Sequence, residues 1–265
     1  MTDDYYKIDC LSFSKLKHIL NSPRKFLQQH ENPFAGSDAT NLGNAIHCWI
    51  QNQKELVSFL PDLSQVKTKD GRIAKVPHNT AEGKQIVEDF KKTIPSGNFI
   101  VPCNTLSMLI HLEKNYFENP EIQEIMRNIS KFEAAYFGTI QDLKFKGKLD
   151  AENKDCIVDF KTTYKNVSKY HVAKSLIFDE CYHMQLAIYG SLKAQNENKN
   201  FDAYDYKIIF FETEPPYDVK MYHISISTIQ LGLELLHKAI DKYKNHILTD
   251  NALFIPSEII WEKFQ

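Results

Sequence analysis

Apolar side chains recur at helical spacing over the first 130 residues. This spacing predicts helices at 12–20, 40–60, 80–93 and 104–127. A further short helix is expected to begin at Ser22-Pro23, because proline is favoured at the first helical position. We expect Asn119-Pro120 to interrupt the last of these helices, and the polar segment 61–77, with its Asp-Gly turn, to form an exposed loop or hairpin.

From residue 131 onward, runs rich in β-branched and aromatic residues replace the helical spacing. The predicted strands are 132–140, 143–152, 156–163, 203–214 and 218–227. Helices are expected at about 179–196 and 228–248. Short polar turns join the first three strands, which predicts an antiparallel meander. The order of elements predicts an α/β (α+β) fold with a central mixed β-sheet flanked by helices.

The length of 265 residues suits one domain with a substantial core. We therefore predict a single domain over 1–265, mainly helical in 1–130 and carrying the sheet and the last helix in 131–265. Hydrophobic content of 43% and charged content of 25% are typical of a soluble globular protein. No stretch approaches the roughly 20 apolar residues that a membrane span needs, and we expect no membrane partner.

Five cysteines are scattered along the chain without a C-x-x-C pair. This pattern argues against a disulfide framework or a zinc ribbon and fits a reducing compartment. The first residues are acidic and lack the long apolar run of a signal peptide. Together these features predict a cytoplasmic protein.

The formal net charge is −2, so overall charge gives no indication of a nucleic-acid partner. A surface for such a partner would have to be a local basic patch. The chain has three arginines, Arg24, Arg72 and Arg127, which leaves few candidates for a bidentate phosphate contact. Arg24 stands at a predicted helix start, where backbone N–H groups favour anions, and a terminal 5′-phosphate would suit it.

The run "CIVDFKTT" places Asp159 and Lys161 on one face of a predicted strand. If the loop before it is Asn153-Lys154, then Asp150 of the preceding strand lies opposite Ile157 and is the diagonal neighbour of Asp159. A three-residue loop would instead turn one carboxylate to the other face. In the simplest register the two carboxylates converge beside the lysine.

Two carboxylates and a lysine around a hard cation have a defined chemical use. Such a cation polarises a phosphoryl oxygen and lowers the pKa of a bound water. The lysine orients that water or stabilises the developing negative charge. Oxygen ligands favour Mg²⁺, with Mn²⁺ able to substitute, over zinc or copper.

The spacing "KLD", eight residues, "DFK" resembles the D…(D/E)-x-K signature of the PD-(D/E)xK nuclease superfamily. Asp150, Asp159 and Lys161 then take the signature positions, with Asp159 in the place more often held by glutamate. The resemblance implies a restriction-endonuclease-like core around the predicted sheet. On its own the D-x-K tripeptide is also common as a surface ion pair.

Three further matches are similar to the RecB-like branch of this superfamily. "GNAIH" at 43–47 resembles a G-x-x-x-H motif, and "QLAIY" at 185–189 resembles a Q-x-x-x-Y motif. Glu133 corresponds to an extra acid of that branch. The wider run "DFKTT…YHMQLAIY" followed by "ETEPPYDVKMY" resembles the phage and prophage RecE-type exonucleases, which are exonuclease VIII-like.

The resemblance implies roles for individual residues. The implied metal ligands are His47, Glu133, Asp150 and Asp159. Lys161 joins the two aspartates in catalysis, and Gln185 with Tyr189 would contact the DNA backbone or orient Lys161. Gly43, one helical turn before His47, would allow another element to approach closely.

The same resemblance implies a magnesium-dependent exonuclease on linear double-stranded DNA that degrades the 5′ strand. It further implies a ring-shaped homo-oligomer and a partner recombinase that anneals single strands. Two alternatives remain open: a module on the same scaffold that binds DNA or protein without cutting, and a sequence-specific endonuclease. The retained acids and lysine favour cutting, and no obvious recognition region supports the endonuclease.

Overall fold

A five-stranded sheet forms the centre of the computed structural model, which describes residues 3–31 and 37–247. The strands are β3 (Lys131–Ile140), β4 (Leu143–Glu152), β5 (Cys156–Thr163), β6 (Asp205–Glu212) and β7 (Val219–Ile224). They lie side by side in chain order, and β5 pairs with β6 in parallel while the other neighbours are antiparallel. The predicted meander and mixed sheet are confirmed.

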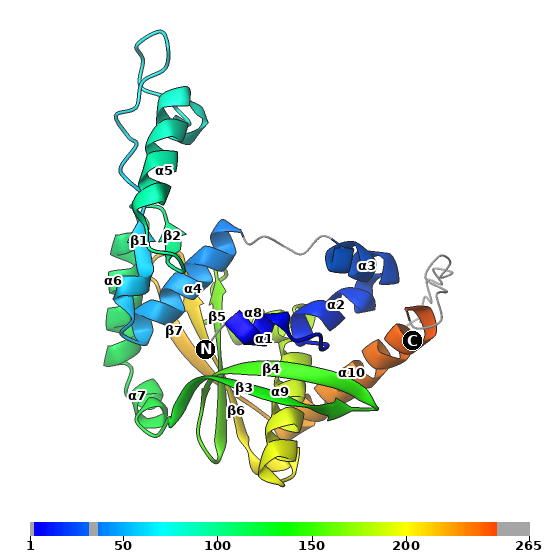
Figure 1. The fold of residues 1–265 in the computed structure, drawn as a ribbon. Helices are drawn as coiled ribbons and strands as arrows, with labels where there is room; N and C mark the ends of the chain where they lie inside the picture. The colour runs from blue at the N-terminus through cyan, green and yellow to red at the C-terminus, as the bar shows by residue number, and fades with distance from the viewer. Residues whose placement is uncertain (1–2, 32–36, 248–265) are drawn as a thin grey trace, which may run out of the picture.

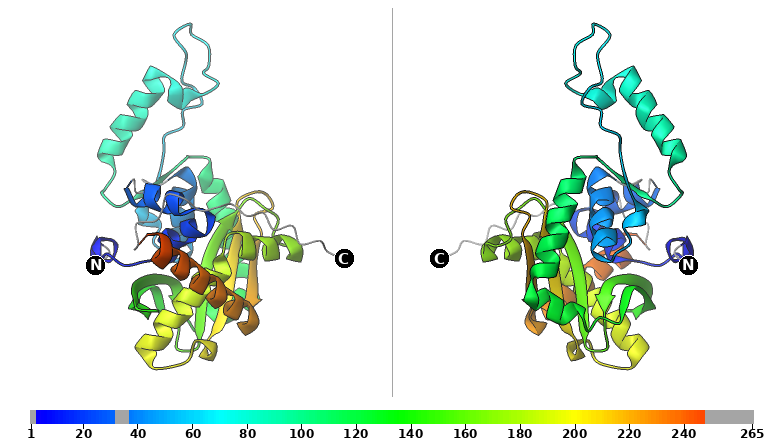
Figure 2. Two further views of the ribbon diagram at one scale, coloured as in Figure 1. Left: turned by 90° about the vertical axis from the view of Figure 1, so that its right-hand side faces the viewer. Right: turned by 90° about the vertical axis from the view of Figure 1, so that its left-hand side faces the viewer.

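Helices cover both faces of this sheet (Figures 1 and 2). The helices are α1 (Asp3–Lys7), α2 (Phe13–Asn21), α3 (Pro23–Glu31), α4 (Asp38–Ile50), α5 (Ala81–Thr93), α6 (Thr105–Glu118), α7 (Pro120–Met126), α8 (Tyr170–Asp179), α9 (Tyr182–Glu197) and α10 (Ile226–His246). One core cluster joins the sheet to α2, α3, α8, α9 and α10, and a second joins it to α4, α6 and α7. Short 3₁₀ turns occur at Lys54–Leu56, Pro77–Asn79 and Phe201–Ala203.

The run "YKIIFFE" in β6 places apolar side chains on both faces of the sheet. Ile208 and Phe210 belong to the core cluster that contains α9, whereas Ile209 and Phe211 belong to the cluster that contains α4. A strand that has helices on both faces must be apolar at successive positions rather than alternate ones. The bulky pattern therefore places β6 in the interior of the sheet.

The register of the β4–β5 hairpin differs from the prediction by two residues. Ala151 pairs with Val158, and the Asn153 N–H donates to the carbonyl of Cys156 at 3.1 Å, so the loop is Lys154-Asp155 rather than Asn153-Lys154. A shift of two residues keeps every side chain on its face. The predicted convergence of the carboxylates therefore survives a wrong register.

Several predicted boundaries were also wrong. The predicted helix at 40–60 ends at Ile50, and its last residues form β1 (Val57–Phe59), which pairs in parallel with β2 (Phe99–Val101). Neither α1 nor α8 was predicted. The end of the helix expected at 228–248 and the segment after it fall partly outside the described residues.

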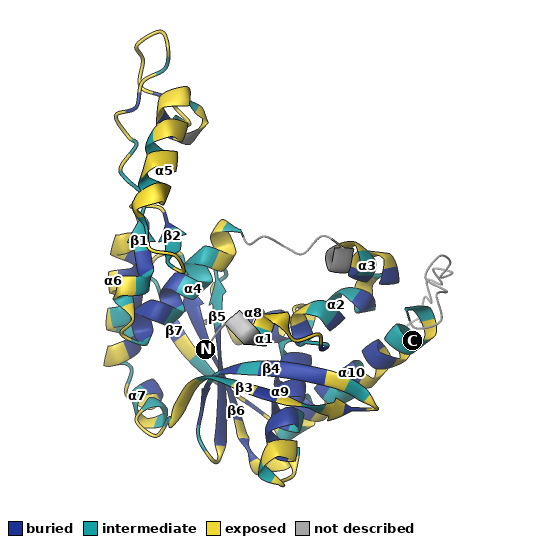
Figure 3. Ribbon diagram, viewed as in Figure 1, coloured by how far each residue is buried: buried dark blue, intermediate teal, exposed yellow. Residues whose placement is uncertain are grey.

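Residues 60–98, between β1 and β2, form a projection that we call the arm (Figure 1). The arm contains α5 and a hairpin around Gly71, where Lys67 and Ile73 form an antiparallel bridge. Most of its side chains are exposed (Figure 3). The predicted hairpin in 61–77 is thus confirmed.

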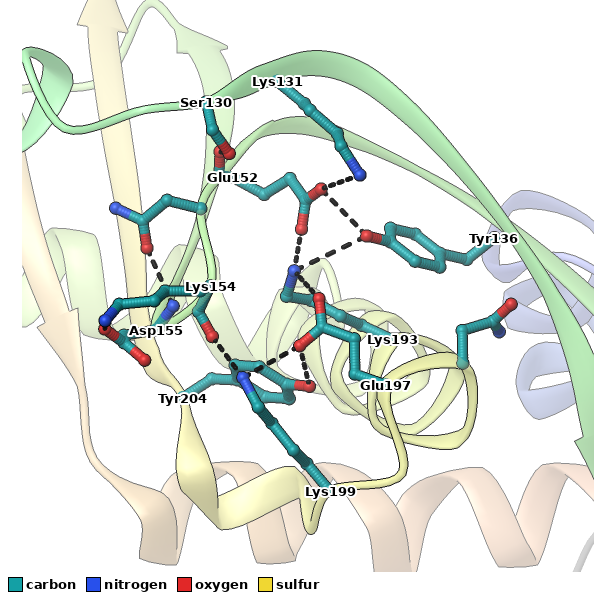
Figure 4. A network of polar contacts seen from close by, with 12 residues as sticks. Ser130, Lys131, Tyr136, Glu152, Lys154, Asp155, Lys193, Glu197, Lys199 and Tyr204 are labelled. Carbon is teal, nitrogen blue, oxygen red and sulfur yellow. Dashed lines mark hydrogen bonds and ion pairs between the residues drawn. The ribbon is translucent and has the colours of Figure 1, made fainter.

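A buried ion-pair network attaches α9 to the β3–β4 hairpin (Figure 4). Lys193 of α9 contacts Glu152 of β4, and each side chain is 1% exposed. Tyr136 of β3 donates its hydroxyl proton to Glu152 at 2.8 Å, and Glu197 lies 2.7 Å from the Lys193 ammonium. The network fixes α9 against the strand that carries Asp150.

The five cysteines of the chain, Cys10, Cys48, Cys103, Cys156 and Cys181, are all free thiols. Within 3–31 and 37–247, no helix combines the length and the apolar character needed to cross a bilayer.

Gly232 of α10 provides a test of this packing. A Cβ at this position would lie 2.2 Å from the backbone oxygen of His183 in α9, so Gly232→Ala forces the two helices apart. We expect the free energy of unfolding to fall by about 1–3 kcal/mol, as for other overpacked cores. Urea denaturation measures this change.

Gly43 of α4 is the matched control, because an added Cβ there meets only the Thr162 hydroxyl oxygen at 3.7 Å. This ordinary contact shows that Gly43 is not required for close approach, contrary to the expectation from sequence. Gly43→Ala should raise the free energy of unfolding by up to about 1 kcal/mol through helix propensity. Equal destabilisation by both substitutions would contradict this account.

The buried network gives a second test. Lys193→Met leaves the buried Glu152 with only one cation nearby, the largely exposed Lys131 at 3.7 Å, and we expect a loss of about 3 kcal/mol in the free energy of unfolding. Adding Glu152→Gln removes the stranded charge, and the double variant should regain most of that loss. A double variant less stable than Lys193→Met in urea denaturation would contradict the assignment.

Candidate active site

The site forms where β4 separates from β5. The two strands pair over only two residues, ending at Ala151 opposite Val158, and the next residues in register are Asp150 and Asp159. Beyond this point β3 and β4 cross the molecule at a steep angle to β5 (Figure 1). The backbone of Leu11 pairs with the freed edge of β4 instead. We call this opening the fork.

Side-chain alternation along β4 breaks at Asp150. Leu149 packs in the core cluster that contains α9, whereas Ala151 packs in the cluster that contains α4. Residues two apart on a regular strand face the same side, so the strand turns over between them. This turn, together with the fork, leaves space around the Asp150 carboxylate.

Glu133 lies opposite Asp150 on β3, between the pairs Phe132–Ala151 and Ala134–Leu149. Its φ of 53° is in the left-handed region. A non-glycine residue held there costs about 1–3 kcal/mol, and such strain clusters at functional sites. Glu133, Asp150 and Asp159 therefore form one row of acids across three adjacent strands.

His47 approaches this row from α4. Its Nδ1 lies 3.8 Å from the Glu133 carboxylate and 4.0 Å from that of Asp150. Burial lowers the pKa of His47, but the charges of Asp150 and Glu133 outweigh burial and the net pKa is raised. One ligand atom from each of the three residues lies within 4.8 Å of the others.

This spacing fits a divalent cation. Oxygen ligands lie about 2.0–2.6 Å from Mg²⁺ or Ca²⁺, so ligands on opposite sides are about 4–5 Å apart. Two carboxylates and one imidazole are a donor set that can hold a divalent cation. The predicted ligands His47, Glu133 and Asp150 are thus brought together.

Asp159 lies beside this group and is completely buried. Its Oδ1 accepts a hydrogen bond from the Gln185 amide at 3.1 Å, and its Oδ2 lies 2.6 Å from the Lys161 ammonium. That ion pair is not aligned as a hydrogen bond, which leaves Oδ2 without a directed donor. Burial raises the pKa of Asp159 to about 6, against the opposing effect of Lys161. A cation at the Asp150 side would relieve this penalty.

Lys161 lies between Asp159 and the ring of Tyr182, whose centroid is 4.8 Å from the ammonium. Burial lowers the pKa of Lys161, but Asp159 and Asp150 outweigh it and the net pKa is raised. The lysine is therefore held as a cation at the edge of the acid row.

Gln185 and Tyr189 share one face of α9, as their spacing predicts. The Gln185 amide nitrogen donates to the Tyr189 hydroxyl at 2.7 Å as well as to Asp159. The pair therefore orients Asp159, whose other carboxylate oxygen lies beside Lys161. Gly147 of β4 lets the Tyr189 ring lie against the strand, because a Cβ there would be 2.9 Å from the ring.

Asp150 is held by the backbone of β5. Its Oδ2 accepts the N–H of Phe160 at 2.7 Å, and this bond takes the place of the ladder that ends at the fork. Phe160 also contacts the His47 ring edge-on at 5.3 Å. One residue thus positions two of the candidate ligands.

Lys148 of β4 and Tyr182 of α9 were missed from the sequence. Lys148 stands two positions before Asp150 on β4 and forms an ion pair with Glu133 of β3. The run "KFKGKLD" could have indicated Lys148, because alternation along a strand puts this lysine on the same face as Asp150. No local pattern marks Tyr182, because its role depends on how α9 packs against β5.

His47, Glu133, Asp150, Gln185 and Tyr189 line a cavity of about 380 Å³. Tyr5 and Tyr6 of the N-terminal segment also line it. The predicted phosphate residue Arg24 is not among the lining residues and is exposed on α3. The structure therefore brings all the predicted site residues together except Arg24.

The fold agrees with the comparisons to known proteins. Residues 12–252 match the family model "PDDEXK-like domain of unknown function (DUF3799)". A crystal structure from Eubacterium rectale, described as a "putative exonuclease", is similar in fold, with a TM-score of 0.59 and 11% identity over 97% of this chain and 95% of that one. No curated protein matches this chain.

The family model covers most of the chain and includes every element that contributes a candidate ligand. The expectation of a PD-(D/E)xK fold is confirmed, whereas assignment to the RecE-type branch stays a prediction. The chain belongs to the family of PDDEXK-like domains, DUF3799.

Proposed function

We propose that this protein is a metal-dependent exodeoxyribonuclease that hydrolyses phosphodiester bonds at the ends of linear double-stranded DNA. The observation that carries this proposal is the acid row Glu133, Asp150 and Asp159 with Lys161 at its edge and His47 above it. The membership in a PDDEXK-like family and the fold shared with a protein described as a "putative exonuclease" support it.

The residues around the fork would have different roles in hydrolysis. His47, Glu133, Asp150 and Asp159 would hold Mg²⁺, or Mn²⁺ in its place. When bound, such a cation supplies a polarised phosphoryl oxygen and a water of lowered pKa. Lys161 presents its ammonium to the negative charge that develops on the phosphate, and Gln185 keeps Asp159 in place. The 3′-oxygen is the leaving group.

The resemblance to RecE-type exonucleases extends the proposal to the strand that is digested and to the partners of the enzyme. On that basis the enzyme digests the 5′ strand, works as a homo-oligomeric ring and serves phage-type recombination with a partner that anneals single strands. Arg24 would contact a terminal 5′-phosphate only if the DNA end reaches α3, outside the cavity. The cytoplasm is the proposed location.

The complete acid row argues against a module that binds without cutting. Three buried or half-buried acids and a strained Glu133 are costly to maintain on a surface that only binds DNA. DNA is itself an anion, so binding alone would favour a row of cations at this position. The arrangement suits a site that holds a cation between protein and phosphate.

A labelled linear duplex tests the proposal. With Mg²⁺ the wild-type protein should release a 5′ label as mononucleotide before a 3′ label, and EDTA should stop the reaction. Asp159→Asn and Lys161→Met should each reduce the rate at least roughly a hundredfold, since each removes charge at the reacting phosphate.

Lys174→Met, at an exposed position of α8, is the control for loss of one lysine and should cut like the wild type. Release of the 3′ label first would reverse the polarity but leave a nuclease. Equal rates for wild type and Asp159→Asn would overturn the assignment of the site.

The raised pKa values of Asp159 and His47 predict how cation binding depends on pH. Both groups must lose their protons to bind a cation, so protons and Mn²⁺ compete. As the pH falls, the Kd for Mn²⁺ should begin to rise above pH 6.5, where His47 takes up its proton, and rise more steeply below about 6, where Asp159 is protonated too, by up to tenfold per pH unit for each proton displaced. Titration calorimetry from about pH 5 to pH 8 measures this, and a Kd independent of pH would contradict it.

A further inference from the structure

The tip of the arm carries a concentration of positive charge that the active site does not use. Residues 67–75 contain Lys67, Lys69, Arg72 and Lys75 but only one acid, Asp70, which gives this stretch a net charge of +3 in a chain of net charge −2. All four cations are exposed, and Arg72 contacts Asp70 at 3.3 Å.

The tip is a formed hairpin rather than an irregular loop. The Thr68 N–H donates to the Arg72 carbonyl at 2.8 Å, and the Gly71 N–H donates to the Thr68 carbonyl at 2.9 Å. Gly71 has a φ of 82°, which the turn requires. Below the turn the Ala74 N–H donates to the carbonyl of Val66 at 2.9 Å, and both side chains are 6% exposed.

The 3₁₀ turn that follows the hairpin is packed tightly on the start of α5. Gly83 of α5 packs so closely on the 3₁₀ turn at Pro77–Asn79 that a Cβ would lie 2.1 Å from the Pro77 carbonyl oxygen. The Thr80 hydroxyl donates to that same oxygen at 2.7 Å and accepts the Gly83 N–H at 2.9 Å. The chain that leaves the hairpin is therefore fixed to the start of a helix within a few residues.

The base of the arm is fixed to the element that carries His47. Strands β1 and β2 pair at the base, and the Asn98 side chain donates to the Glu55 carbonyl and to the Ser58 hydroxyl at 2.9 and 3.0 Å. Val57 and Val101 of these strands share a core cluster with α4. The tip projects from the side of the molecule that carries α4. The turn that follows α9 lies at the other end of the molecule (Figures 1 and 2).

We propose that the arm tip is a second DNA contact, which binds the phosphate backbone of the duplex outside the active site. Helix α5 spans 13 residues, about 20 Å at 1.5 Å per residue, and roughly six base pairs of B-DNA cover that length. The major groove admits two antiparallel chain segments side by side, and the exposed cations near the turn of the hairpin would meet the flanking phosphates. Ile73, 59% exposed among these cations, adds an apolar contact toward the groove.

This inference rests on the proposed DNA substrate and adds duplex binding to it. The alternative reading, an exposed solvated loop, does not account for a net charge of +3 at the end of a braced projection. A contact of this kind is independent of sequence, because it reads phosphates rather than base edges. It would hold the duplex while the fork acts on its end.

The test removes the four cations together, in Lys67→Ala, Lys69→Ala, Arg72→Ala and Lys75→Ala. Binding to a duplex of about 40 base pairs is measured by fluorescence anisotropy in EDTA, so that no cutting occurs. The variant should bind at least about tenfold more weakly near 100 mM salt, and the slope of log K against log salt should become shallower by up to about 3.6, from about 0.9 for each of four lost phosphate contacts.

The matched control removes four exposed lysines elsewhere: Lys114, Lys174, Lys220 and Lys238. Its salt slope should stay close to that of the wild type. An arm variant with the wild-type slope, or one that changes only the oligomeric state in gel filtration, overturns the inference. A wild type that binds but never cuts labelled duplex overturns the proposed function and leaves the arm contact standing.

Discussion

The buried carboxylate of Asp159 beside that of Asp150 is the constraint on which the rest of the site depends. Two acids at the end of one strand pairing repel each other, and burial makes the charge of Asp159 costly. Lys161 offsets part of that cost from within the same strand. The remaining features around the fork each stabilise or accommodate one of these two carboxylates.

The fork itself follows from this constraint. A continuous ladder would pack Asp150 and Asp159 side by side with no room for a cation between them. Because β4 leaves β5 at Ala151, Asp150 can accept the Phe160 N–H and turn toward His47. The left-handed Glu133 completes the opening from β3, and Lys193 fixes α9 behind it through Glu152.

Much of this arrangement was predictable from local patterns. Alternation along "CIVDFKTT" placed Asp159 and Lys161 on one face, and the spacing of four placed Gln185 and Tyr189 on one helical face, as the structure shows. The order of helices and strands predicted the mixed sheet. These features depend on periodicity, which the chain carries in each segment independently.

The features that were missed depend on contacts between distant segments. The register of the β4–β5 hairpin depends on which two residues form its loop. The composition of "ENKDC" fits both Asn153-Lys154 and Lys154-Asp155. Tyr182 meets Lys161 only because α9 packs on β5, and Arg24 is excluded from the cavity by the packing of α3. Periodicity predicts which face a residue occupies, but not which distant residue faces it.

The two halves of the chain contribute different parts of one site. The sheet supplies the acids and the lysine, whereas α4 supplies His47 and, through its contact with β1 and β2, supports the arm. One helix therefore carries a candidate ligand of the cation site and supports the base of the arm. A duplex that contacts the tip would then be held on the same side of the molecule that supplies His47, and positioning of this kind is what an enzyme that removes nucleotides one at a time from a DNA end requires.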